Sequence, residues 1–175
     1  MTVITRAPTS DEYTSGGWTG GWADVDDYPD QVSTMSGTVY TAATKRFGFT
    51  AFDVPAGSTA ITVTMRIWHF DTGSGACAFK PCLKVNGTQY DHGTVIPTYG
   101  DAVNNSASWA TNPNTAAAWT VADVNGSGSN PLQAFGIQVT DNTPTIQIAS
   151  IQLEVEYTEG APAGTARSQV IIIGG

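Results

Sequence analysis

Residues 58–70 restrict the fold more than any other stretch, because apolar and polar side chains alternate along them without a break. The apolar set consists of Ile61, Val63, Met65 and Ile67. The intervening set consists of Thr62, Thr64, Arg66 and Trp68. A period of two residues places the two sets on opposite faces of a β-strand. The chain is therefore predicted to contain a long strand with one face in a core.

Segments on either side of this strand predict further strands. Residues 45–54 place Phe47, Phe49 and Ala51 on one face, and the Pro-Ala-Gly-Ser sequence that follows predicts a turn. This strand is expected either to pair with the 58–70 strand or to lie in a facing sheet. Asn86-Gly87 lies between two β-rich runs, and this dipeptide favours the type I′ turn of a β-hairpin.

The last strands carry a change of parity. Residues 134–140 place Phe135, Ile137 and Val139 on one face. In the following run the apolar positions are first even and then odd, in the order Ile146, Ile148, Ile151, Leu153, Val155 and Tyr157. One unpaired residue near Ala149-Ser150 would produce this change, which predicts a β-bulge or a crossing between sheets.

Helical periodicity is absent from the sequence, and residues 97–133 are rich in turn-forming residues. They predict long loops around a short strand at 118–121, with one helical turn as an option in the alanine run. The helix formers Leu, Glu and Lys are scarce, whereas Thr, Val and Ile are frequent. About eight strands separated by turn signals predict an all-β fold, a two-sheet antiparallel β-sandwich of the jelly-roll type.

The two ends of the chain are predicted to be extended arms. We expect an N-terminal arm over residues 1–17, the β-sandwich over 18–158, and a linker with an apolar strand over 159–175. Four consecutive β-branched residues, Val170, Ile171, Ile172 and Ile173, follow the loose linker. Such a run is an aggregation hazard when exposed, so it is expected to extend its own sheet or that of a neighbouring subunit.

The glycine-rich run at residues 15–34 combines aromatic and acidic side chains. Asp24, Asp26, Asp27 and Asp30 could bind calcium, but the EF-hand spacing is not met, and a solvated acidic turn is the preferred interpretation. Trp18, Trp22 and Tyr28 could stack on a sugar, but aromatic side chains in β-proteins more often fill a core or an interface. No metal site is predicted.

No catalytic residue or cofactor is predicted, because none of the established catalytic or phosphate-binding motifs occurs. His69 is interpreted as a strand-end histidine bonded to backbone, and His92 as a turn residue. Cys77 and Cys82 lie five residues apart, so a straight strand would keep them unbridged. A turn at Lys80-Pro81 would permit a disulfide; free thiols are the preferred alternative.

Charge and hydropathy narrow the class of partner. Seven basic residues stand against fifteen acidic ones, for a net charge of -8. This balance disfavours nucleic acid and anionic lipid as partners. The longest aliphatic run is far too short to span a bilayer, and the first residues lack the pattern of a secretory signal, so we expect a soluble protein without a membrane partner.

The order of these features resembles a β-sandwich module of tailed-bacteriophage virion proteins, found in capsid decoration (cement) proteins and in related tail or fibre components. The similarity runs from about residue 21 to residue 157. Its most specific part is an NP-x-T, WT and D element followed by a glycine-bearing strand, here Asn112, Pro113, Thr115, Trp119, Thr120, Asp123 and Gly136.

The resemblance implies a non-enzymatic protein that stabilises the outer surface of a phage head. It would be made in the host cytoplasm, bind the major capsid protein and itself, often as a homotrimer, and use its arms as clamps. Trp18 and Trp22 would then lie at the docking surface of an arm, and residues Val170 to Ile173 would reach a partner. The alternative function is a receptor- or carbohydrate-binding module of a phage tail or bacterial surface protein. A glycan hydrolase ranks third.

Overall fold

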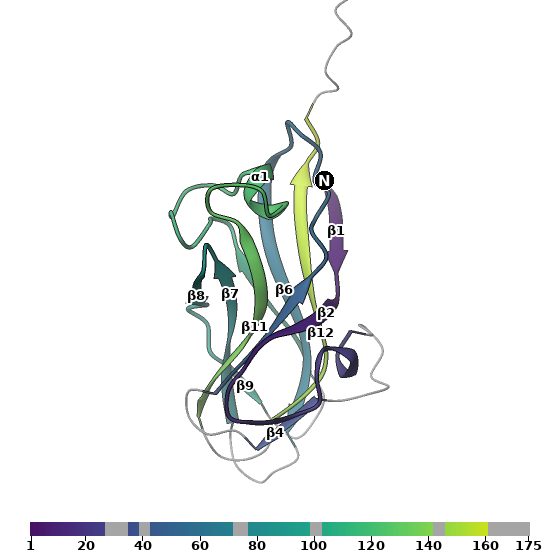
Figure 1. Cartoon of the computed structure of the whole chain (residues 1–175), viewed down its shortest axis with the longest axis vertical. Coiled ribbons are helices and arrows are strands. Elements are labelled where there is room, and N and C mark those ends of the chain that lie inside the picture. The colour runs from purple at the N-terminus through teal and green to yellow at the C-terminus, as the bar shows by residue number, and fades with distance from the viewer. Residues whose placement is uncertain (27–34, 39–42, 72–76, 99–102, 142–145, 161–175) are drawn as a thin grey trace, which may run out of the picture.

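The chain forms a jelly-roll-like β-sandwich of two antiparallel sheets, which confirms the predicted fold class (Figure 1). The computed structural model describes residues 1–26, 35–38, 43–71, 77–98, 103–141 and 146–160. Its strands are β1 (Thr2–Arg6), β2 (Pro8–Thr14), β3 (Gly17–Thr19), β4 (Met35–Thr38), β5 (Thr44–Phe49), β6 (Thr59–Asp71), β7 (Cys77–Val85), β8 (Thr88–Asp91), β9 (Ile96–Thr98), β10 (Val103–Trp109), β11 (Leu132–Asp141) and β12 (Ile146–Thr158). Two short helices are η1 (Trp22–Asp24) and α1 (Val121–Val124).

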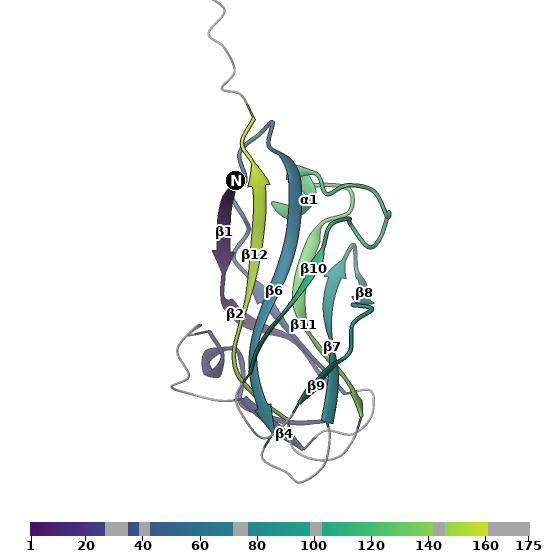
Figure 2. The same cartoon turned by 180° about the vertical axis from the view of Figure 1, so that it is seen from behind.

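One sheet, called sheet A below, has the strand order β10-β6-β12-β4-β3, and β1 also pairs with β12. Its two long strands, β6 and β12, lie side by side (Figure 2). The other, sheet B, has the order β2-β5-β11-β7-β8, and β9 also pairs with β7. The predicted 45–54 and 58–70 strands therefore lie in facing sheets.

The core lies between the sheets and is built from the predicted apolar faces. Val63, Met65 and Ile67 of β6 have no exposed surface, and Ile61 has 5%. From sheet B, Phe47 and Phe135 face them, with ring centroids 6.2 Å apart. Phe49 packs against this core as predicted, whereas Ala51 lies beyond the end of β5 and is exposed.

Two local predictions are confirmed. Asn86 and Gly87 connect β7 to β8 with backbone φ angles of 49° and 80°, the left-handed values that a type I′ turn requires. In β12 the pairing with β6 shifts between Ile148 and Ser150, so Ala149 is the extra residue that changes the parity. The bulge keeps the apolar side chains on both sides of it in the core.

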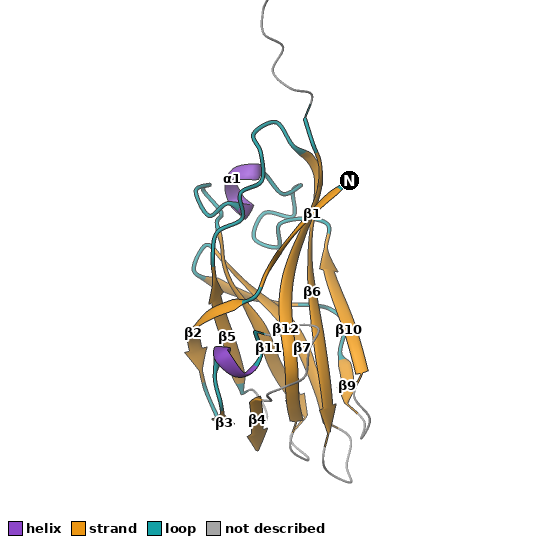
Figure 3. Cartoon of the chain, turned by 90° about the vertical axis from the view of Figure 1, so that its right-hand side faces the viewer, coloured by secondary structure: helices purple, strands orange, loops and turns teal. Residues whose placement is uncertain are grey.

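The N-terminal residues belong to the sandwich, which corrects the prediction of an arm over residues 1–17. β1 pairs with β12 of sheet A, and β2 pairs with β5 of sheet B. Ala7 alone separates the two strands, so the chain passes directly from one sheet to the other (Figure 3). The sequence lacked a clear apolar alternation here, because Ile4 is the one large apolar side chain of these strands that packs against the core. The predicted apolar strand at Val170 to Ile173 lies outside the described residues.

The loop between β10 and β11 lies at the end of the sandwich where β12 finishes (Figure 1). The predicted short strand at 118–121 is wrong in its extent: Ala118 makes an isolated bridge with Thr111, and residues 121–124 form α1 instead. Thr120 begins the helix, because its hydroxyl accepts a hydrogen bond from the backbone N–H of Asp123 at 3.1 Å.

Cys82 is a free, buried thiol, as preferred from the sequence. Both cysteines belong to β7, and no turn interrupts the strand at Lys80-Pro81. Pro81 is tolerated because the outer edge of β7 changes partner there, from β9 at residues 77–79 to β8 at residues 82–85. Its carbonyl oxygen accepts a hydrogen bond from the His92 N–H at 2.7 Å.

Candidate functional site

One row of paired positions crosses four strands on the outer face of sheet B. The register aligns Arg46 of β5 with Gly136 of β11, Gly136 with Cys82 of β7, and Cys82 with Asp91 of β8. The neighbouring residues Phe47 and Phe135 point into the core, so this row faces outward. Its members come from segments far apart in the sequence, and strand pairing alone brings them together.

Glu12 links the two sides of this face. The pairing of β2 with β5 shifts between Asp11 and Tyr13, and Glu12 is the extra residue at this bulge. Its carboxylate accepts a hydrogen bond from Arg46 Nε at 2.7 Å and another from Lys84 Nζ at 2.5 Å. Arg46 and Lys84 lie on the strands that flank β11, which presents only Gly136 and Ala134 opposite them. The small residues leave room for the carboxylate to bridge the centre of the sheet.

Amide side chains continue the network toward β8. Arg46 donates to the side-chain oxygen of Gln89, and the Gln89 amide donates to Asp91 at 2.7 Å and to Gln138 at 3.1 Å. Thr44 donates its hydroxyl proton to Gln138. Each side chain is therefore held in place by its neighbours before any ligand arrives.

Tyr13 provides an aromatic surface beside this network. The Arg46 guanidinium carbon lies 4.5 Å from the centroid of the Tyr13 ring. The side chain of Arg46 is only 13% exposed, whereas Tyr13 is 46% exposed. One face of the ring is thus fixed by the cation, and much of the side chain remains accessible to solvent.

Glu12 forms ion pairs with two cations of this face. Burial by itself raises the pKa of Glu12, but the hydrogen bonds and charges of Lys84 and Arg46 outweigh it and hold that pKa below its usual value. Burial raises the pKa of the Cys82 thiol strongly, and the Asp91 carboxylate raises it further. Cys82 is therefore an uncharged floor to the site and a poor nucleophile.

We call the following group of residues the outer face of sheet B: Glu12, Tyr13, Thr44, Arg46, Lys84, Gln89, Asp91 and Gln138. Together they offer fixed hydrogen-bond donors and acceptors next to one accessible aromatic ring. Such a combination can bind a hydroxyl-bearing ligand, and it lacks an activated group for covalent chemistry.

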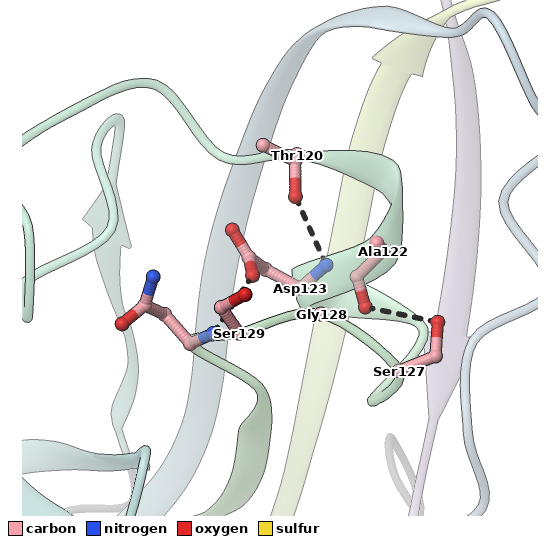
Figure 4. Close-up of a pocket in the computed structure, with 7 residues that line it drawn as sticks. Thr120, Ala122, Asp123, Ser127, Gly128 and Ser129 are labelled. Atoms are coloured by element: carbon pink, nitrogen blue, oxygen red, sulfur yellow. Dashed lines mark hydrogen bonds between the residues drawn. The ribbon is translucent and has the colours of Figure 1, made fainter.

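A second polar region lies beside α1, where a hollow of about 410 Å³ is lined by Thr120, Ala122, Asp123, Ser127, Gly128, Ser129 and Asn130 (Figure 4). The Asp123 side chain points into this loop, where Oδ1 accepts the Asn130 N–H at 3.2 Å. A Cβ on Gly128 would collide with the same carboxylate. Asp123 thus holds the turn together, and its contacts give it a structural role.

The residues that carried the phage resemblance have structural roles as well. Asn112 is fully buried and binds the backbone of Asn114 and Asn130. Trp119 donates its indole N–H to the carbonyl oxygen of Trp109 at 3.0 Å. A Cβ on Gly136 would collide with the Lys45 carbonyl oxygen of the neighbouring strand. These contacts order the loop and the sheet.

The glycine-rich run at residues 15–34 divides between core and turn. Trp18 of β3 is partly buried and packs against the core. Trp22 of η1 is 37% exposed, and its backbone N–H donates to Asp11 Oδ1 at 3.0 Å. Asp24 accepts the Gly21 N–H at 2.8 Å and so closes the turn. Tyr28, Asp27 and Asp30 lie outside the described residues. Within the part of the chain that the structure describes, no group of three or more His, Cys, Asp or Glu side chains could hold a metal ion.

Both histidines are placed as predicted, but the hydrogen-bond partner of His69 differs from the one expected. His69 ends the buried face of β6, and its Nε2 lies 2.7 Å from Asn105 Oδ1 rather than against backbone. His92 lies in the turn after β8, edge-on to Trp109 at 4.9 Å between ring centroids. Across the described ranges, no helix is both long and apolar enough to cross a membrane.

Sequence reasoning missed the outer face of sheet B. Its outward positions, Arg46, Lys84 and Gln138, could have been recognised from strand parity. Their mutual contact required the strand order and the bulge at Glu12, and neither is visible in a single sequence.

No protein-family model and no curated protein matches this chain. Among solved structures, it is similar to the CBM22-1 xylan-binding domain from Paenibacillus barcinonensis Xyn10C, with a TM-score of 0.52 and 10% sequence identity. The similarity covers 90% of this chain and 95% of that domain. At this identity it shows a shared β-sandwich fold, and the fold is not specific to phage modules.

Proposed function

We propose that this chain is a non-catalytic carbohydrate-binding module, and that its glycan lies on the outer face of sheet B. The observation that carries the proposal is the fixed network around Arg46, with Tyr13 stacked on its guanidinium. The xylan-binding activity in the name of the structural neighbour supports this choice of ligand class.

The chemistry of the network matches that of a sugar. A sugar hydroxyl both donates and accepts; within the network Gln89 Oε1 keeps one acceptor site for it and Gln138 Nε2 keeps one N–H. A pyranose ring also has apolar C–H surfaces that pack on an aromatic ring, and Tyr13 offers one with little conformational freedom left to lose.

The capsid-decoration hypothesis depended on two free arms. Residues 2–14 are instead paired within the two sheets, and residues 161–175 lie outside the described part of the chain. Binding to a major capsid protein, trimer formation and a position in the virion therefore remain predictions from the resemblance alone. The alternative that the sequence offered, a carbohydrate-binding module, becomes the preferred function.

Binding of soluble polysaccharides, xylans among them, tests the proposal by affinity electrophoresis and calorimetry. We expect Tyr13→Ala to weaken binding by about tenfold or more, because stacking on a sugar contributes on the order of 1–2 kcal/mol. Trp22→Ala is the matched control, since it removes an exposed aromatic side chain from η1. Asp11, which accepts the backbone N–H of Trp22, pairs with Lys45 on the opposite face of β5 from Arg46.

Two results would contradict this assignment. Absence of binding to every polysaccharide tested would reject the function, and loss of binding in Trp22→Ala but not in Tyr13→Ala would move the site to η1.

A further inference from the structure

We infer that the glycan bound on the outer face of sheet B is neutral, and that Glu12 sets this preference by occupying both cations of the network. The inference rests on the proposed function and adds the chemical class of the ligand and the residue that selects it.

Both cations of the network are already paired with one carboxylate. Arg46 and Lys84 both donate to the single carboxylate of Glu12, at 2.7 and 2.5 Å. The exposed fractions of these two basic side chains are 13% and 25%, and that of Glu12 is 24%. A uronate or sulfate group that approached either cation would lie beside the partly buried Glu12 carboxylate, an anion next to an anion. Such an arrangement is costly.

The charge of the surroundings also disfavours an anionic ligand. The network holds two cations, Arg46 and Lys84, and two carboxylates, Glu12 and Asp91, so these four charges cancel, and Lys80 lies opposite Gln138 on the same face. The whole chain carries -8, and this field repels polyanions at low ionic strength. Neutral hydroxyls meet no such barrier: Gln89 Oε1 accepts one hydrogen bond from Arg46 and can accept another, and Gln138 Nε2 donates one to Val139 and can donate another.

Paired polysaccharides that differ in charge test this inference. Neutral arabinoxylan and β-glucan serve as one arm, and polygalacturonate and alginate as the other, at neutral pH. We expect wild-type protein to bind a neutral polymer with an affinity that changes little with added salt, and to bind the acidic polymers more weakly. Weak salt dependence is expected because no charge on the ligand is being neutralised.

The variant Glu12→Gln tests the selecting residue. It keeps the shape of the side chain and removes the charge, so Arg46 and Lys84 become available to an anion. We expect the affinity for the acidic polymers, relative to the neutral one, to rise by about tenfold at low salt, the size of one charge-assisted hydrogen bond. Glu154→Gln is the matched control: Glu154 pairs with Arg66 at 2.8 Å on the other sheet and should leave the preference unchanged.

The outcomes separate the two proposals. If wild-type protein binds the acidic polymers better than the neutral ones, the inference is overturned while the glycan-binding function stands. An unchanged preference in Glu12→Gln, with thermal unfolding showing a folded protein, would also overturn it. If Glu12→Gln does not fold, the salt dependence of wild-type binding decides, and a steep loss of affinity with salt argues against a neutral ligand. Binding to no polysaccharide rejects the function itself.

Discussion

At the scale of single residues, His69 of β6 is a titratable side chain held in a buried, closely packed environment. Its ring is 1% exposed and lies edge-on to Phe79, with centroids 5.0 Å apart. Nε2 bonds to Asn105, and Nδ1 is buried with no hydrogen-bond partner. Burial lowers the pKa of His69, and the hydrogen bond to Asn105 opposes this only in part. The folded protein therefore holds His69 neutral.

This imidazole should make stability fall in mild acid. The folded pKa lies below the unfolded value of about 6.5, so the unfolded chain binds the proton first as the pH drops. The stabilisation is complete above that value and is lost progressively below it. We expect the free energy of unfolding in urea to be lower at about pH 5 than at about pH 7.5.

The paired variants His69→Gln and His92→Gln identify the source of this dependence. His69→Gln should flatten the pH profile, and His92→Gln is the comparison variant because it removes the other histidine, which lies in a partly exposed turn. A wild-type profile that is flat over this range would contradict the assignment. Glu12 contributes a separate loss of stability at more acidic pH, since its folded pKa is lowered.

Single-residue roles were the hardest part to predict from the sequence. Trp18 and Asp24 attracted attention as sugar and calcium ligands because of their side-chain chemistry. The structure assigns Trp18 to packing against the core and Asp24 to the closure of a turn. Glu12 and Tyr13 attracted none, because their importance comes from a bulge that presents them to strands pairing much later in the chain.

At the scale of elements, β11 is the central strand of sheet B and the strand over which Glu12 reaches. Gly136 lies between Arg46 and Cys82 in the register, and a Cβ there would meet the backbone of β5. We expect Gly136→Ala to destabilise the protein by about 1–3 kcal/mol, the usual cost of overpacking a well-packed site. Chemical denaturation measures this directly.

Gly93→Ala is the control for that substitution. An added Cβ at Gly93 has no neighbouring atom within 4 Å, and the change should alter stability by no more than about 0.5 kcal/mol. Equal effects of the two substitutions would argue that the close approach of β5 and β11 is not what requires glycine at position 136.

Elements were predicted well wherever a core face imposed strict alternation. The apolar positions of β6 and β12, including the parity change at Ala149, were read correctly because burial of one face leaves only one acceptable register. The short strands β1 and β2 were missed, because edge strands bury little and their pattern is weak. α1 was missed for a different reason: it is one turn long and depends on its Thr120 cap more than on periodicity.

At the scale of the whole molecule, the first two strands join the sheets. β1 closes one side of sheet A, β2 forms the edge of sheet B, and Asp11 of β2 also makes an ion pair with the buried Lys45 at 3.1 Å. Removal of residues 1–14 should lower the midpoint of thermal unfolding by several degrees or prevent folding, since it deletes two strand pairings and uncovers a buried charge.

A free N-terminal arm would behave differently, because its deletion would leave the midpoint unchanged. Val3→Thr provides the control, as Val3 is 52% exposed and the change keeps a β-branched side chain on β1. It should leave stability within about 0.5 kcal/mol of wild type.

The pairing of Thr2 with Tyr157 also has a mechanical consequence, since it places the start of the first strand beside the finish of the last one (Figure 1). Tension applied between residues 1 and 160 would open the β1–β12 ladder one hydrogen bond after another, like a zipper, instead of loading all its bonds at once. If other polypeptide were joined to both ends, the sandwich would be attached to it at one end only and would unfold at low force.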